Sequence, residues 1–115
     1  MRSLSRVRRI SEFDRQLLLD LKSIVESHVP GAEVILYGSA ARGTRQPDSD
    51  YDVLIVTPGK LSSQEEEELD AVVYHLELDR EVVLSALICA QEEWSRPMFR
   101  ASPYHRNVVK EGIVL

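Results

Sequence analysis

The sequence contains a single cysteine, Cys89, so no disulfide bond can form within the chain. This cysteine lies in an apolar stretch, which is typical of a buried thiol and fits a reducing compartment. No apolar run approaches the roughly 18 residues that indicate a membrane-spanning helix. The first ten residues carry four arginines and lack the apolar core of a signal peptide. We therefore expect a cytoplasmic protein that does not enter a membrane.

Two further classes of protein are excluded by what the sequence lacks. None of His28, His75 and His105 has metal-ligand spacing with another histidine or with the cysteine, which excludes a zinc site. Only 14 Lys and Arg stand against 19 Asp and Glu, which gives a formal net charge of -5. A protein that coats nucleic acid needs an excess of basic residues to neutralise phosphates, so nucleic acid binding is not expected as the main role. A single nucleotide held through a metal ion needs no such excess.

The length and composition fit one domain. The chain has 115 residues, 43% of them hydrophobic, which is enough for a single core and short for two. Residues 1–10 form a basic arm with four arginines, Arg2, Arg6, Arg8 and Arg9. Such an arm either contacts a phosphate or an acidic partner, or is simply solvated. We expect the domain itself to occupy residues 11–115.

Hydrophobic periodicity predicts helices and strands along residues 11–115. One helix is predicted from Ser11 to the Pro30-Gly31 turn, a second from Ser62 or Ser63 through Leu76, and a third from Ser102 to Glu111. Strands are predicted at 33–37, 51–57 and 82–90. The last of these is apolar apart from Ser85, which is typical of a strand covered on both faces.

A glycine and a serine directly after the first predicted strand indicate a phosphate-binding turn. The segment from Leu36 to Val56 is LYGSAARGTRQPDSDYDVLIV. Gly38 lets the backbone approach a bulky anion closely, and the N–H groups of the turn that follows can point at phosphate oxygens. Ser39 adds a hydroxyl that can donate to the same phosphate.

Two aspartates in the same segment indicate a metal site. Asp50 and Asp52 stand two residues apart at the start of the strand 51–57, so both carboxylates project from one face. Hard oxygen ligands of this kind are the ones that Mg²⁺ prefers. In nucleotidyl transfer such ions neutralise the triphosphate and stabilise the leaving pyrophosphate. The pair therefore predicts a magnesium site.

Arg42 has two interpretations of similar weight. Its planar guanidinium suits phosphate oxygens, so it can reach a bound triphosphate. Alternatively it braces the loop by pairing with Asp48 or Asp50.

The order strand, Gly-Ser, ten residues, Asp-x-Asp and strand closely resembles the nucleotidyltransferase superfamily of DNA polymerase β. The runs GSAARG (38–43) and SDYD (49–52) resemble its shortest branch, the minimal nucleotidyltransferases. Segments 83–88, 92–94 and 106–112 are also similar to such proteins, so the resemblance covers nearly the whole chain after the arm. It implies an α/β (α+β) fold, in which a small mixed β-sheet is flanked by helices and the nucleotide lies over the Gly-Ser turn.

The resemblance also implies an activity. The expected enzyme is a Mg²⁺-dependent nucleotidyltransferase that moves a nucleoside monophosphate from a nucleoside triphosphate to an acceptor hydroxyl. ATP is the expected nucleotide. Asp50 and Asp52 are the implied catalytic metal ligands, and Gly38, Ser39 and Arg42 the implied phosphate ligands. The minimal branch often resembles the antitoxin half of a toxin–antitoxin pair whose partner is a HEPN-domain protein, in which case a partner side chain is the acceptor. The sequence also leaves a homo-oligomer open.

One departure from the family pattern gives an alternative function. The resemblance implies a third carboxylate on the next strand, but the position that matches is Ser85. A hydroxyl is neutral and a weak ligand, so a site for two metal ions would be incomplete. Asp79 and Glu81, just before that strand, are the other carboxylates considered for this role. The alternative is a nucleotide-binding antitoxin or regulatory module with weak or no catalysis.

Overall fold

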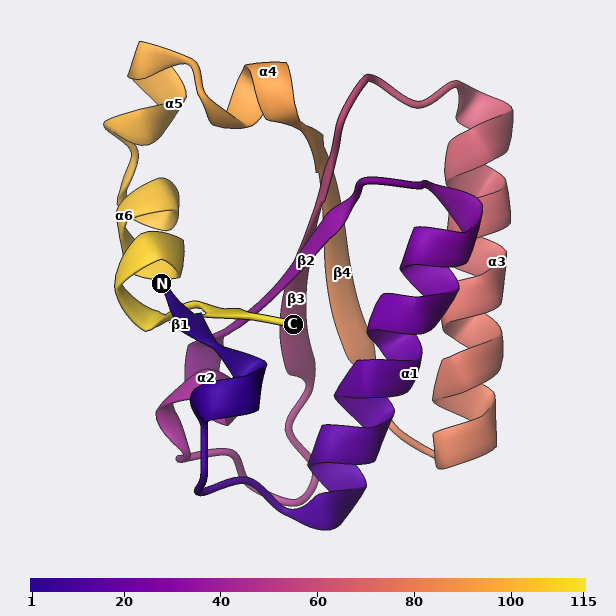
Figure 1. The fold of residues 1–115 in the computed structure, drawn as a ribbon, viewed down its shortest axis with the longest axis vertical. Helices are drawn as coiled ribbons and strands as arrows, with labels where there is room; N and C mark the ends of the chain where they lie inside the picture. Colours follow the sequence, from indigo (N-terminus) through magenta and orange to yellow (C-terminus); the bar gives the residue numbers. More distant parts are fainter.

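A five-stranded mixed sheet runs through the middle of the protein (Figure 1). The computed structural model describes every residue from Met1 to Leu115. Strand β2 pairs antiparallel with β3 and with β5, β3 pairs parallel with β4, and β1 pairs parallel with β5. The order across the sheet is β1-β5-β2-β3-β4. The strands are β1 (Arg2–Ser3), β2 (Glu33–Tyr37), β3 (Tyr51–Thr57), β4 (Leu84–Ala90) and β5 (Ile113–Val114).

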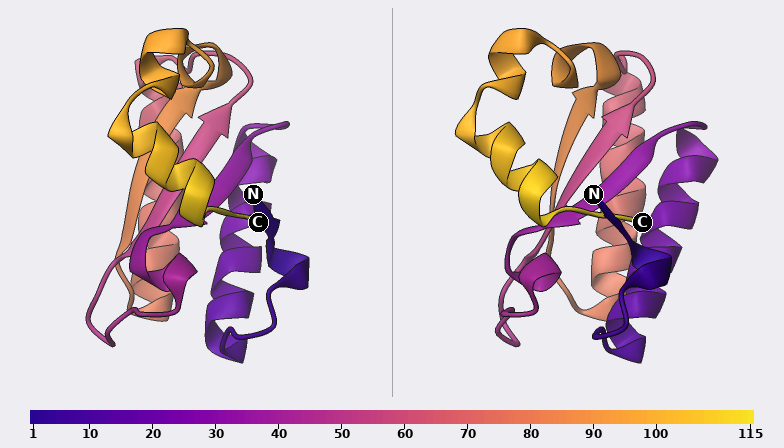
Figure 2. Two further views of the ribbon diagram at one scale, coloured as in Figure 1. Left: turned by 90° about the vertical axis from the view of Figure 1, so that its left-hand side faces the viewer. Right: turned by 60° about the vertical axis from the view of Figure 1, so that its left-hand side comes forward.

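Helices cover both faces of the sheet, so the molecule has three layers (Figure 2). Helices α1 (Glu12–His28) and α3 (Ser63–Arg80) pack together on one face. The C-terminal helices α4 (Gln91–Trp94), α5 (Pro97–Arg100) and α6 (Pro103–Glu111) lie on the other. The short helix α2 (Gly38–Arg42) follows β2 directly. None of these helices combines the length and the apolar character needed to cross a membrane.

Strand β3 is the centre of the core because its side chains are buried on both faces. Tyr51, Val53 and Ile55 belong to the large cluster that includes α1 and α3, whereas Leu54 and Val56 pack on the opposite face. On that second face they contact Trp94 of α4 and Val108 of α6. Full burial of each such side chain stabilises the fold by about 1.5–3 kcal/mol, which fixes β3 firmly between the two helical layers.

Serine caps begin the three long helices, as the sequence predicts. The side chains of Ser11 and Ser102 accept hydrogen bonds from the backbone N–H groups three residues on. Ser62 and Glu65 form a reciprocal capping box. Such caps typically stabilise a helix by about 1 kcal/mol. The predicted strands 33–37 and 51–57 are also confirmed with the same bounds.

The prediction for the strand at 82–90 needs a correction. Strand β4 begins at Leu84 and is an edge strand, and its Ser85 and Leu87 side chains are exposed rather than covered. Leu84 is buried in the cluster of α1 and α3, with Ala86 packed against it, so only one face of the strand is covered there. The apolar run therefore indicated the strand but not its position at the edge, and Ser85 lies on the open face.

The N-terminal arm is tied to the rest of the structure. Arg2 and Ser3 pair with β5, and Leu4 is only 3% exposed within the large core cluster. The guanidinium of Arg15 on α1 donates to the carbonyls of Leu4 and Val7. Residues 1–10 thus add a short strand and a core side chain to the domain expected at 11–115, because an apolar residue within the arm is buried against α1.

Replacing Leu4 by alanine tests the packing of the arm. The change removes a buried side chain, so we expect the free energy of unfolding to fall by about 2–4 kcal/mol, measured by urea denaturation. Arg8 is exposed on the same arm, and Arg8→Ala should stay within about 0.5 kcal/mol of the parent. Equal stability of Leu4→Ala and the parent protein would show that the arm is not packed in solution.

Candidate metal and phosphate site

The register of three strands brings the predicted site residues together. Tyr37, the last residue of β2, pairs with Asp52 near the start of β3, and Asp52 pairs with Ser85 on β4. Gly38 follows Tyr37 immediately, so the turn, the aspartate and the serine lie side by side across the sheet. Ser85, which matches the third carboxylate of the family pattern, thus lies next to Asp52 on the neighbouring strand.

Gly38 and Asp52 lie so close together that a residue with a side chain at position 38 would clash with Asp52. Gly38 has a φ of 73°, a left-handed conformation that residues with a Cβ adopt at a cost. A Cβ at this position would lie 2.3 Å from Oδ2 of Asp52. The absence of a side chain therefore lets the Asp52 carboxylate lie directly against the backbone of the turn.

Negative charge is concentrated around Asp52. Partial burial raises the pKa of the Asp52 carboxyl, and the neighbouring Asp50 and Glu111 carboxylates raise it further, while Arg42 opposes them. Asp50 is exposed and accepts a hydrogen bond from the Ser85 hydroxyl at 3.2 Å. A divalent cation would relieve this crowding, and carboxylate and hydroxyl oxygens are donors that suit Mg²⁺. The donor set fits a metal ion, although no three His, Cys, Asp or Glu side chains cluster closely enough to form a complete protein cage.

Glu111 joins the site from the C-terminal helix, a role that no sequence pattern predicted. Its Oε2 accepts the Gly38 N–H at 3.0 Å, and its Oε1 pairs with Arg42 Nη1 at 2.9 Å. One interpretation of Arg42 was a pairing with Asp48 or Asp50. In the structure Arg42 pairs with Glu111 instead. Glu111 is 69 residues from Arg42 in the sequence, and no local pattern links two residues so far apart.

The loop before Asp50 is held by an arginine and a tyrosine. The guanidinium of Arg45 lies 4.1 Å from the centre of the Tyr51 ring, donates to the Tyr51 hydroxyl at 2.7 Å, and donates to the carbonyl of Ser49 at 3.0 Å. The Tyr51 hydroxyl in turn donates to Asp14 on α1. These contacts fix the two residues that flank Asp50, which sets where its carboxylate projects.

Neither of the other carboxylates considered for a third metal ligand lies beside Asp52. Asp79 pairs with Arg80 at the end of α3, on the opposite face of the sheet. Glu81 is exposed at the C-cap of α3 and lines a small depression with Arg45 and Ser49.

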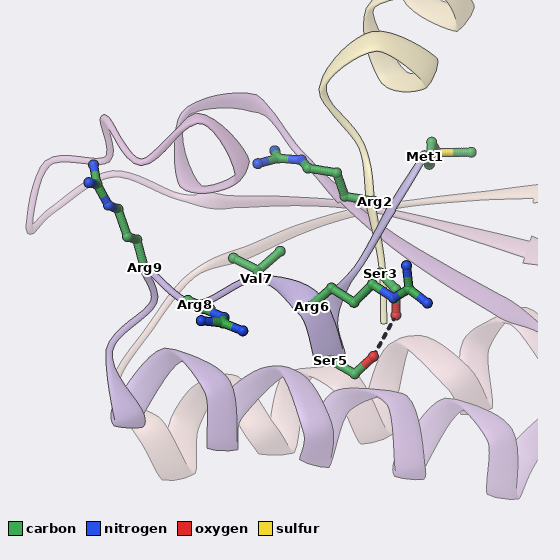
Figure 3. A pocket seen from close by; sticks show the side chains of 8 residues that line it. All are labelled: Met1, Arg2, Ser3, Ser5, Arg6, Val7, Arg8 and Arg9. Atoms are coloured by element: carbon green, nitrogen blue, oxygen red, sulfur yellow. Dashed lines mark hydrogen bonds between the residues drawn. The ribbon is translucent and has the colours of Figure 1, made fainter.

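The arginines of the arm line a separate depression of about 850 Å³ that contains no carboxylate (Figure 3). That depression therefore has no carboxylate ligands for a metal ion.

A sequence model of a known family matches most of the chain. The model is described as a nucleotidyltransferase domain, and it aligns with residues 18–115. The chain belongs to the nucleotidyltransferase domain family. The matched residues of this nucleotidyltransferase domain include Gly38, Asp52, Ser85 and Glu111. No curated protein sequence matches the chain.

Solved structures share the fold at low sequence identity. A chain in a crystal structure of a toxin–antitoxin with AMP-PNP has a TM-score of 0.50 and 19% identity, over 84% of this chain and 68% of that chain. A chain in the structure of a toxin–antitoxin MntA–HpeT mutant has a TM-score of 0.53 and 16% identity, over 84% of this chain and 69% of that chain. A chain in the structure of a tri-AMPylated HEPN toxin of Shewanella oneidensis in complex with an MNT antitoxin has a TM-score of 0.49 and 14% identity, over 85% of this chain and 67% of that chain. The first two similarities confirm the predicted fold of a small mixed sheet flanked by helices.

Two glycine substitutions separate backbone strain from the contact with Asp52. Gly38 and Gly43 both have positive φ, but a Cβ at Gly43 would meet nothing within 4 Å. Each change to alanine should cost about 1–2 kcal/mol of stability for the left-handed backbone. Only Gly38→Ala should also displace the Asp52 carboxylate, which the ¹³C shift of that carboxyl group reports. An unchanged Asp52 signal in Gly38→Ala would contradict the close contact.

Proposed function

We propose that this domain transfers a nucleoside monophosphate from ATP to an acceptor hydroxyl in a Mg²⁺-dependent reaction. The observation that carries the proposal is the contact of the Asp52 carboxylate with the Gly38 backbone. It supports the proposal because the Asp52 carboxylate lies beside a turn whose N–H and neighbouring guanidinium both contact a carboxylate, that of Glu111. This is the arrangement that a metal–triphosphate complex requires.

Each site residue has a role in this proposal. Asp50 and Asp52 would hold Mg²⁺, and the Ser85 hydroxyl donates a hydrogen bond to Asp50. When bound, the ion would neutralise charge on the triphosphate. Gly38 N–H, the Ser39 hydroxyl and Arg42 hold the phosphates, so the triphosphate is fixed in the orientation needed for in-line attack.

The reaction exchanges one bond to phosphorus for another. The acceptor oxygen forms a bond to the α-phosphorus, the bond from that phosphorus to the bridging oxygen breaks, and pyrophosphate leaves with the bonding electron pair. The proton of the acceptor hydroxyl passes to solvent water. The open face of β4 beside Ser85 and Leu87 is the exposed approach to this site, because both side chains lie in solvent.

The partner we propose is a HEPN-domain toxin, with one of its side-chain hydroxyls as acceptor. Two considerations support this assignment: the resemblance of the GSAARG and SDYD runs to minimal nucleotidyltransferases, and the toxin–antitoxin complexes that share the fold. We place the reaction in the cytoplasm.

A second candidate function is favoured by one specific observation. Ser85 stands beside Asp52 on β4, where active relatives are expected to carry a third carboxylate. With two carboxylates, the site holds one divalent ion more readily than two. The domain would then bind nucleotide as an antitoxin or regulator without turning it over.

A transfer assay distinguishes the two functions. The purified chain, a HEPN-domain partner, Mg²⁺ and ATP labelled at the α-phosphate are incubated, and label on the partner is measured. We expect label transfer that falls at least about a hundredfold in Asp52→Asn, because that change removes a metal ligand. Asp48→Asn is the matched control, since Asp48 is an exposed aspartate in the same loop without a place in the site.

The outcomes of this assay are distinct. Ser85→Asp adds the carboxylate that the family pattern implies and should increase transfer, whereas Leu87→Asp adds the same charge two residues further along the same face and should not. Nucleotide binding without transfer, in the parent and in Ser85→Asp, would reject the enzyme and favour the binding module. Absence of nucleotide binding would reject both functions.

A further inference from the structure

The carboxylate of Glu111 makes the contacts that a phosphate group would make. One oxygen accepts the N–H of the Gly38 turn, and the other pairs with the Arg42 guanidinium. In proteins, a glycine N–H and an arginine side chain typically donate hydrogen bonds to phosphate oxygens. The two oxygens of a carboxylate present the same charge sign and nearly the same hydrogen-bond geometry as two phosphate oxygens.

The charges around the site favour release of Glu111 from Gly38 and Arg42 when a triphosphate binds together with its metal ion. Asp50, Asp52 and Glu111 are three carboxylates, and Arg42 is the cation that opposes them at Asp52. A bound metal–triphosphate brings positive charge to the aspartates and a competing anion to Arg42. Glu111 then loses its counterion, and like-charge repulsion from the phosphate opposes its original position.

The backbone of Glu111 is fixed, so only its side chain has to move. Arg2 of the arm donates to the Glu111 carbonyl at 3.2 Å and to the Ala41 carbonyl of α2 at 2.9 Å. Gly112, the next residue, packs so closely that an added Cβ would lie 2.4 Å from the Val108 carbonyl. Glu111 is partly exposed, with 21% of its side-chain surface accessible, which leaves a route to solvent. A rotamer change is sufficient to release both donors.

We propose that Glu111 is a positioning residue that holds the Gly38 N–H and Arg42 in place in the free chain and is displaced by a nucleotide phosphate. It therefore competes with the nucleotide and lowers its affinity. This inference rests on the proposed function, because it requires that the Gly38 turn binds phosphate.

The test compares nucleotide affinity between two carboxylate-to-amide variants. The dissociation constant of an ATP analogue with a methylene bridge between the α- and β-phosphates is measured by calorimetry with Mg²⁺ present. Glu111→Gln keeps the shape of the side chain and removes its charge, so we expect binding about fivefold tighter than in the parent. Glu33→Gln, at the opposite end of β2, removes the same charge from an exposed position and should leave affinity unchanged.

A second readout follows the Gly38 amide by NMR. In the nucleotide-free state its resonance should differ between the parent and Glu111→Gln, because the charged acceptor has been removed. With saturating analogue the two resonances should coincide, because the same phosphate oxygen then accepts the N–H in both proteins. Weaker or unchanged affinity of Glu111→Gln, or different resonances at saturation, would overturn the role of Glu111. A parent protein that binds no nucleotide would reject the proposed function itself, and the inference with it.

Discussion

The site depends on one close approach, that of the Asp52 carboxylate to the backbone of Gly38. The antiparallel register of β2 and β3 places these residues next to each other, and the burial of β3 between two helical layers keeps that register fixed. Slipping the register by one residue would turn Asp52 to the opposite face of the sheet, so the apolar side chains of β3 specify the site as well as the core.

The charge pattern of the site explains why it suits a ligand that carries both signs. Partial burial and the neighbouring carboxylates disfavour ionised Asp52, whose pKa is raised. The folded chain thus keeps a carboxylate in a position where ionisation costs stability, which is common where a residue is retained for binding. In the proposed function, a metal–nucleotide complex would supply a cation for the aspartates and an anion for the Gly38 turn and Arg42, so that one ligand would satisfy both sets of groups.

Much of this arrangement was predictable from local sequence. Serine caps and 3.6-residue periodicity predict the three long helices, and the spacing of Gly38-Ser39 and Asp50-Asp52 predicts that these residues share one site. The resemblance also implied that Ser85 stands where the family carries a third carboxylate, and in the structure the parallel pairing of β3 and β4 brings Ser85 beside Asp52.

The remainder depends on tertiary contacts that leave no local signal. Glu111 reaches Gly38 across 73 residues, and no helical or strand periodicity marks it. The two-residue strands β1 and β5 are too short for an alternating pattern to identify them, and they form because Leu4 and Ile113 are buried in one core. The edge position of β4 was equally hidden, since its composition is the same as that of a central strand.

The central claim is that a divalent metal ion binds at Asp50 and Asp52 beside the Gly38 turn. Paramagnetic Mn²⁺, added at low ratio to the ¹⁵N-labelled protein, broadens the amide signals of residues within reach of the bound ion. The account predicts that the signals of Gly38, Asp52 and Ser85 broaden first and that excess Mg²⁺ restores them. Broadening confined to the acidic first turns of α3, at residues 65–68, would show that metal binds a surface helix and would contradict the account.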